Sequence, residues 1–184
     1  MLFRSDDTRI QLDNDTSVYI DAGKPGQSII MQEAIDMISK AASRIESISM
    51  LLPDGPLGKA LRIATDREKD PVHAEVVTSS VGPKQALGWG SENVFELLKT
   101  FNRLKHSLSR SNIQIIDMPR GVHSKVLIAD GDTDEAYAYV GTHNLNESGV
   151  KAGTQEWGIF TRDRELVQNL RKQYLDFKSE AGNS

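Results

Sequence analysis

Apolar positions along the first half of the chain follow helical spacing in some segments and strand-like spacing in others. Residues three and four positions apart form an apolar stripe from Met31 to Ile45, which predicts a helix. The apolar run from Ile45 to Leu52 predicts a buried strand. Asp54 and Pro56 are start signals for a second helix, and residues 73–79 have the β-branched character of another strand.

The second half of the chain combines two further helices with a series of short strands. A Gly-rich loop at 82–90, which contains Trp89, precedes a helix that Ser91 is placed to cap. A last helix is predicted to start near Asp163, and the tail after Ser179 is expected to fray. The strand candidates lie at 113–118, 124–129, 136–140 and 155–160. This order of elements predicts a layered α/β domain with a mixed β-sheet flanked by helices.

The composition is that of one globular domain covering residues 1–184. The chain is 38% apolar and 26% charged, and it has no cysteine, so disulfides and thiolate metal sites are excluded. No apolar run approaches the roughly 18 residues of a membrane span, and the polar start does not resemble a secretory signal, so a cytoplasmic protein is expected. The net charge of −4 lacks the overall basic footprint of strong nonspecific nucleic-acid binding. No cofactor or metal is expected.

One octapeptide, 123–130, combines a histidine, a lysine and an aspartate in the order H-x-K-x4-D. His123 and Lys125 lie two apart, so on an extended segment their side chains point to the same side. A neutral imidazole beside a fixed cation suits nucleophilic attack on a phosphodiester. Asp130 is an odd number of residues from both, so on a regular strand it faces away, and a structural role is favoured over direct chemistry.

A second cluster, Gly141-Thr142-His143-Asn144, and the later Glu156 complete a set for phosphodiester cleavage without a metal. Asn144 supplies an amide donor and Thr142 a hydroxyl for the phosphoryl oxygens. Glu156 is placed to accept the second ring N–H of the nucleophilic histidine, which fixes its tautomer. His143, inside the cluster, is expected to face elsewhere.

These residues follow the pattern of the phospholipase D superfamily, the HKD phosphodiesterases: H-x-K-x4-D, then G-[S/T]-x-N, then a strand glutamate. The chain resembles bacterial phospholipase D-like proteins from about Gln27 to Phe177, including the segments SMLLPDGPLGKAL and AGTQEWGIFTRDRELVQNL. It departs from them in a longer connection between the two motifs and in a threonine where serine is commoner. The resemblance implies a phospholipase D-like fold and a phosphohistidine intermediate. It also implies a catalytic set of His123, Lys125, Asn144, Glu156 and Asp130, with substrate contacts from Thr142 and Gly141.

Only one such motif is present, although one imidazole cannot easily be both nucleophile and acid in the same step. The resemblance therefore implies a second HKD motif, from a homodimer partner or from a second domain of a longer protein. The leading hypothesis is a phosphodiesterase or phosphatidyltransferase that acts on a phospholipid-like phosphodiester, which also allows peripheral membrane contact. The alternatives are a small dimeric nuclease of the same superfamily, with a nucleic-acid phosphodiester as substrate, and a catalytically silent module of this fold.

Overall fold

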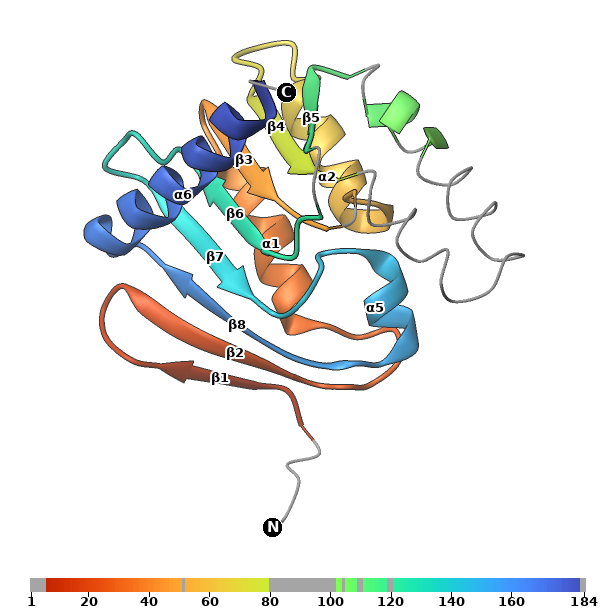
Figure 1. Ribbon diagram of the computed structural model, residues 1–184. Coiled ribbons are helices and arrows are strands. Elements are labelled where there is room, and N and C mark those ends of the chain that lie inside the picture. Colours follow the sequence, from red (N-terminus) through yellow and green to blue (C-terminus); the bar gives the residue numbers. More distant parts are fainter. Residues whose placement is uncertain are drawn as a thin grey trace.

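A computed structural model of the chain contains one eight-stranded sheet with the strand order β1-β2-β8-β7-β6-β3-β4-β5 (Figure 1). The structure describes residues 6–50, 52–79, 102–103, 105–108, 111–118 and 121–182. The strands are β1 (Thr8–Gln11), β2 (Thr16–Ala22), β3 (Arg44–Ile48), β4 (His73–Thr78), β5 (Ile113–Asp117), β6 (Val126–Ala129), β7 (Tyr137–Gly141) and β8 (Gln155–Thr161). The labelled helices are α1 (Ile29–Lys40), α2 (Gly55–Thr65), α5 (Glu147–Ala152) and α6 (Arg164–Gly182).

The sheet is mixed, as the order of elements predicts. Strands β3, β4 and β5 run parallel to one another, and α2 forms the crossover from β3 to β4. The other neighbouring pairs are antiparallel, including the contact between β3 and β6 that joins the two halves of the sheet. The prediction of an α/β domain with a mixed sheet flanked by helices is therefore confirmed.

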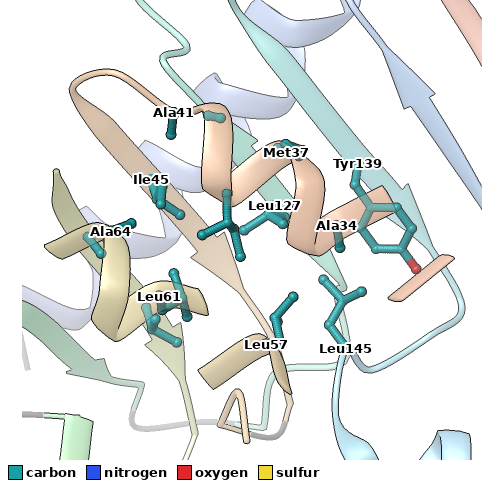
Figure 2. Close-up of a cluster of buried hydrophobic side chains, with 14 of the residues drawn as sticks. Ala34, Met37, Ala41, Ile45, Leu57, Leu61, Ala64, Leu127, Tyr139 and Leu145 are labelled. Atoms are coloured by element: carbon teal, nitrogen blue, oxygen red, sulfur yellow. The ribbon is translucent and has the colours of Figure 1, made fainter. Parts of the chain in front are cut away.

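Each face of the sheet has its own apolar core. On one face, α1 and α2 pack against side chains such as Leu127 and Tyr139, and Figure 2 shows Met37 and Leu61 of the two helices directed into this cluster. On the other face, α6 covers the alternate residues of the same strands, including Ile128. Because successive strand residues point to opposite faces, β6 contributes to both cores and its four residues are all buried. Among the described residues, no helix is long and apolar enough to cross a membrane.

Helix α6 is also attached to the sheet by charged groups. Arg171 Nε lies 2.9 Å from Glu46 Oε2, and Lys178 Nζ lies 2.7 Å from Glu75 Oε2. The hydroxyl of Tyr174 donates to the same Glu75 carboxylate. Burial acts to raise the pKa of Glu75, but the hydrogen bonds from Lys178, Tyr174 and His73 outweigh it and bring that pKa down to about 2.

The first helix ends earlier than the apolar stripe suggests. It is capped at its start by Ser28, whose hydroxyl accepts from the N–H of Met31. It ends at Lys40 rather than near Ile45. The N–H of Ala41 still donates into the helix, but the N–H groups of residues 42–44 donate to a side chain distant in sequence, as described below. The second helix begins as predicted, with Asp54 at its N-cap position.

Three further differences from the sequence prediction concern the ends of the chain and one connection. The antiparallel hairpin β1–β2 and the short helix α5 were not predicted. Helix α6 continues to Gly182, so the expected fraying after Ser179 is wrong. The Gly-rich loop at 82–90 with Trp89, and the helix start expected at Ser91, lie outside the described residues; described helical residues occur at 102–103 and 105–108.

Candidate active site

Two glycines on neighbouring strands open the space in which the motif residues meet. Gly141 of β7 lies opposite Gly158 of β8. A Cβ at Gly158 would overlap the ring of Tyr139, and one at Gly141 would lie 2.6 Å from the Tyr139 hydroxyl. That hydroxyl donates to the backbone oxygen of His143 at 3.2 Å. The glycine pair therefore lets a buried tyrosine hold the start of the loop that follows β7.

Lys125 lies beside this pair and is directed at His123. The register of β6 with β7 places Lys125 opposite Gly141, whose N–H donates to the Lys125 carbonyl at 3.3 Å. Lys125 is only 6% exposed, and its Nζ donates to the His123 backbone oxygen at 2.6 Å and lies 3.3 Å from His123 Nδ1. Burial lowers the pKa of Lys125, and the charge of Glu156 opposes that shift. The imidazole of His123 is exposed.

The His–Lys pair does not lie on a regular strand, although residues 124–129 have a strand-like pattern. Strand β6 begins at Val126, and 121–125 form an extended connection before it. The two side chains nevertheless come together, as expected from their spacing. The expected contact between Glu156 and the His123 ring is not formed, since no hydrogen bond joins these two residues in the described structure. Their link is indirect, through the charge of Lys125.

Thr142 and Asn144 of the second cluster differ in how their side chains are bonded. The Thr142 hydroxyl accepts from the N–H of Trp157 at 3.0 Å and donates to the Trp157 carbonyl at 3.2 Å, so in this structure it closes the β7–β8 pairing. The backbone oxygen of Asn144 accepts from the Ser49 hydroxyl at 3.2 Å. The side-chain Oδ1 of Asn144 is buried without a hydrogen-bond partner among the described residues. The side chain of Asn144 therefore has unused bonding capacity.

Asp130 directs its carboxylate away from this space, although it follows the end of β6 with a φ of 51° and does not lie on the strand. Its carboxylate accepts from the N–H groups of Ala42, Ser43 and Arg44 at 2.7, 2.8 and 2.9 Å, and from the Ser43 hydroxyl at 2.8 Å. Burial acts to raise the pKa of Asp130, but these hydrogen bonds outweigh it and lower that pKa. Asp130 thus ends α1 and fixes the start of β3, which is a structural role.

A carboxylate that the sequence analysis did not select lies next to Glu156. The register of β2 with β8 pairs Asp21 with Glu156. Asp21 is 2% exposed, and its Oδ1 accepts from the N–H of Ile29 at 2.9 Å while its Oδ2 accepts from the Ser28 hydroxyl at 2.5 Å. Its negative charge therefore sits at the positive N-terminal end of α1. The β-branched and aromatic character of residues 16–22 is the sequence signal that could have revealed β2 and hence Asp21.

His143 is buried rather than turned to solvent. Its Nδ1 accepts from the N–H of Leu145 at 2.8 Å, and its Nε2 is buried without a partner among the described residues. Burial lowers the pKa of His143, and the charges of Asp21 and Glu156 oppose that shift. The structure therefore groups an exposed imidazole, a buried ammonium, an open amide and a carboxylate, which are the elements of metal-free phosphodiester chemistry.

Comparison with known proteins assigns the family. Residues 34–177 match the family model described as cardiolipin synthase, PLD-like domain. A search of curated proteins gave no match. Among solved structures, Nuc from Salmonella typhimurium, described as a phospholipase D family member, is similar with a TM-score of 0.64 and 14% identity over 90% of this chain and 96% of that chain. NucT from Helicobacter pylori has a TM-score of 0.60 and 14% identity over the same shares.

A third solved structure, phosphatidylserine synthase from Haemophilus influenzae, matches over 93% of this chain but only 40% of its own length, with a TM-score of 0.60 and 12% identity. At these identities the structural matches support the fold alone. The family-model match spans most of the chain and includes all the motif residues. The chain therefore belongs to the phospholipase D superfamily, in the family of cardiolipin synthase PLD-like domains.

Proposed function

We propose that the chain is a metal-independent phosphodiesterase or phosphatidyltransferase that acts through a phosphohistidine at His123. The observation that carries this proposal is the exposed His123 imidazole with the buried Lys125 ammonium 3.3 Å from its Nδ1. A buried cation beside the attacking group attracts the phosphodiester anion and stabilises the negative charge that develops on its oxygens. Family membership supports the same reaction class, because this superfamily contains phosphodiesterases and phosphatidyltransferases.

In the proposed reaction, His123 Nε2 attacks phosphorus, a P–N bond forms, and the P–O bond to the leaving alcohol breaks. Lys125 and the Asn144 amide bind the non-bridging oxygens. In this structure Nδ1 faces the Lys125 ammonium and can only accept from it. For Nε2 to carry the lone pair, the ring proton moves from Nε2 to Nδ1, and the exposed ring turns so that Nδ1–H donates to Glu156. Water or an acceptor alcohol then attacks the phosphohistidine, restores the free imidazole and gives the hydrolysis or transfer product.

The proton for the leaving oxygen comes from a second histidine in this scheme. One chain supplies one HKD motif, so the second comes from another copy of the chain or from a second domain of a longer protein. The match to nearly the full length of Nuc and NucT supports a unit of this size for one motif. Light scattering combined with turnover tests this point, and full activity of a monomer in dilute solution would contradict it.

A phospholipid-like phosphodiester is the proposed substrate class, with peripheral contact to a membrane surface. The sheet face opposite to the Glu156 side chain leaves the large apolar side chains Ile10, Ile20 and Trp157 of β1, β2 and β8 exposed. A hollow of about 570 Å³ opens over the same strands, lined in part by Ile20 and Trp157. An exposed tryptophan with neighbouring aliphatic side chains suits the boundary between lipid head groups and acyl chains.

A small nuclease is the second candidate. It is favoured by the extent of the structural matches, which cover 96% of the Nuc and NucT chains but 40% of the phosphatidylserine synthase. Binding to DNA needs local positive charge and falls steeply with salt. The two candidates therefore differ in the salt dependence of substrate binding as well as in the substrate itself.

The test is parallel turnover of a generic aryl phosphodiester, phospholipid vesicles and plasmid DNA in the presence of EDTA. His123→Ala is compared with wild type and with His106→Ala, which removes an exposed histidine outside the motif. We expect activity in EDTA, a loss of at least about 10³-fold in His123→Ala, and an unchanged rate in His106→Ala. Denaturation at alkaline pH during turnover, where a P–N bond survives, should trap the phosphoryl group of the substrate on His123. Loss of all activity in EDTA, or full activity of His123→Ala, would refute the mechanism.

A further inference from the structure

Two carboxylates and one imidazole lie close together where the central strands end. Asp21 of β2 pairs directly with Glu156 of β8, and directly opposed residues of antiparallel strands have Cβ atoms about 5 Å apart. On the other side of β8, Gly158 pairs with Gly141, at which β7 ends. Thr142 keeps contact with β8 through its bonds to Trp157, and His143 follows it in the chain. The charges of both Asp21 and Glu156 act on the His143 ring.

Hydrogen bonding fixes the tautomer and direction of the His143 ring. Because Nδ1 accepts from the N–H of Leu145, it carries the lone pair, and the proton of the neutral ring is on Nε2. The Tyr139 hydroxyl holds the His143 backbone oxygen, so the ring cannot move far. Nε2–H is buried and finds no acceptor among the described residues. A buried donor held in this way requires an acceptor nearby.

Of the two carboxylates that act electrostatically on His143, only one has free capacity. Asp21 already accepts from the N–H groups of Ile29 and Ile30 and from the Ser28 hydroxyl. The carboxylate of Glu156 makes no hydrogen bond within the described part of the chain and is half-buried. A small rotation of the Glu156 side chain therefore satisfies both groups, whereas the bonds to α1 hold Asp21 in place.

We propose that His143 is a positioning residue for Glu156: its Nε2–H donates to the Glu156 carboxylate when a phosphoryl group occupies the site. Nδ1 accepts from the backbone of Leu145, and Nε2–H donates to the Glu156 carboxylate. The ring therefore connects the loop that contains Asn144 to β8. The buried Asp21 charge repels Glu156 from the other side and directs it towards His143 and Lys125. This inference rests on the proposed function, in which the same carboxylate orients His123.

Two substitutions of His143 distinguish the roles of its two ring nitrogen atoms. In His143→Asn, the side-chain oxygen lies near the position of Nδ1 and can still accept from Leu145, but nothing replaces Nε2. In His143→Gln, the amide reaches the position of Nε2 and keeps a donor there. The carbon-13 signal of the Glu156 carboxylate is recorded at one pH with inorganic phosphate bound as the probe, and thermal melting reports the fold of each variant.

Loss of a hydrogen bond changes the chemical shift of the carboxylate that accepted it. We expect the Glu156 carboxylate signal to move in His143→Asn and to stay near its wild-type position in His143→Gln. In turnover of the aryl phosphodiester, kcat of His143→Asn should fall by about tenfold or more with little change in KM, and His143→Gln should restore most of it. Equal movements of this signal in both variants, or none in either, would overturn the proposal.

Wild-type protein provides an independent measurement if His143→Asn does not fold. In the phosphate-bound protein, the Nε2–H of His143 should be protected from exchange with water by its hydrogen bond, while Nδ1 remains unprotonated. An Nε2–H that exchanges as fast with phosphate bound as without it refutes the positioning role. Absence of turnover in wild type, together with the expected movements of the Glu156 signal, would refute the proposed function but leave the His143–Glu156 contact established.

Discussion

Replacement of Asp130 by asparagine tests whether the aspartate of the HKD motif acts in folding rather than in chemistry. The carboxylate is 4% exposed and accepts four hydrogen bonds of 2.7 to 2.9 Å from residues 42–44. An asparagine keeps one acceptor oxygen, and its NH₂ group faces a backbone donor. The Ala42 N–H is then left unpaired, which costs about 1–3 kcal/mol. The remaining bonds lose their charge assistance, which adds about 1 kcal/mol. We therefore expect a total loss of about 3 kcal/mol.

Urea unfolding measures this loss, with Asp132→Asn as the matched control. Asp132 lies on the same connection, is half-exposed and contributes a 3.5 Å contact to Arg171, so its replacement should cost no more than about 0.5 kcal/mol. The depressed pKa of Asp130 stabilises the fold above the unfolded value of 3.8, and this contribution is lost as the pH falls through the folded pKa. The difference between wild type and Asp130→Asn should therefore shrink in acid.

Activity per folded molecule decides between the two roles. At a temperature where both proteins are folded, Asp130→Asn should retain turnover within about threefold of wild type, because the side chain faces away from Lys125. If Asp130→Asn unfolds like wild type but is inactive, the structural role is wrong and the aspartate takes part in the reaction.

Two further substitutions test the packing of the sheet that carries the site. Gly158→Ala should lose about 2–3 kcal/mol in urea unfolding, since its Cβ overlaps the Tyr139 ring; Gly182→Ala, with open space around it, is the control, and equal stability of the two variants would contradict the packing. Lys178→Met should lose about 2 kcal/mol at pH 7, because it removes a hydrogen-bonded cation from buried Glu75. The Glu75 pKa of about 2 contributes stability above the unfolded value of 4.5 and loses it as the pH falls towards 2, so the loss in Lys178→Met should be smaller at pH 3 than at pH 7.

The elements that sequence patterns predicted well are those stabilised by local signals. Helix α2 begins where Asp54 and Pro56 indicate, because a proline in the first turn has the backbone angle of a helix and no N–H to lose. The Asp54 carboxylate does not cap the helix; it accepts from the N–H of Glu147. The end of α1 could not be predicted from its apolar stripe. It is set by Asp130, which lies almost ninety residues further along the chain and takes the N–H groups of 42–44. A contact of that sequence separation leaves no trace in local periodicity.

The motif identified most of the site residues but not their hydrogen bonds or their burial. Spacing brought His123 and Lys125 together correctly, although they precede β6 rather than lie on it. Spacing alone could not show that the Thr142 hydroxyl bonds to the backbone of Trp157. The burial of His143 also depends on the pairing of β7 with β8, which a sequence pattern does not specify.

The N-terminal hairpin changes how the site should be understood. The family match begins at residue 34, so β2 and Asp21 lie before it. Yet β2 pairs with β8 along its whole length, and Asp21 connects the N-terminus of α1 to the strand position of Glu156. Without β2, β8 would be an edge strand and the Glu156 side chain would lose the charge that opposes it from one side. The position of the Glu156 carboxylate thus depends on β2, a segment that the sequence motif does not include.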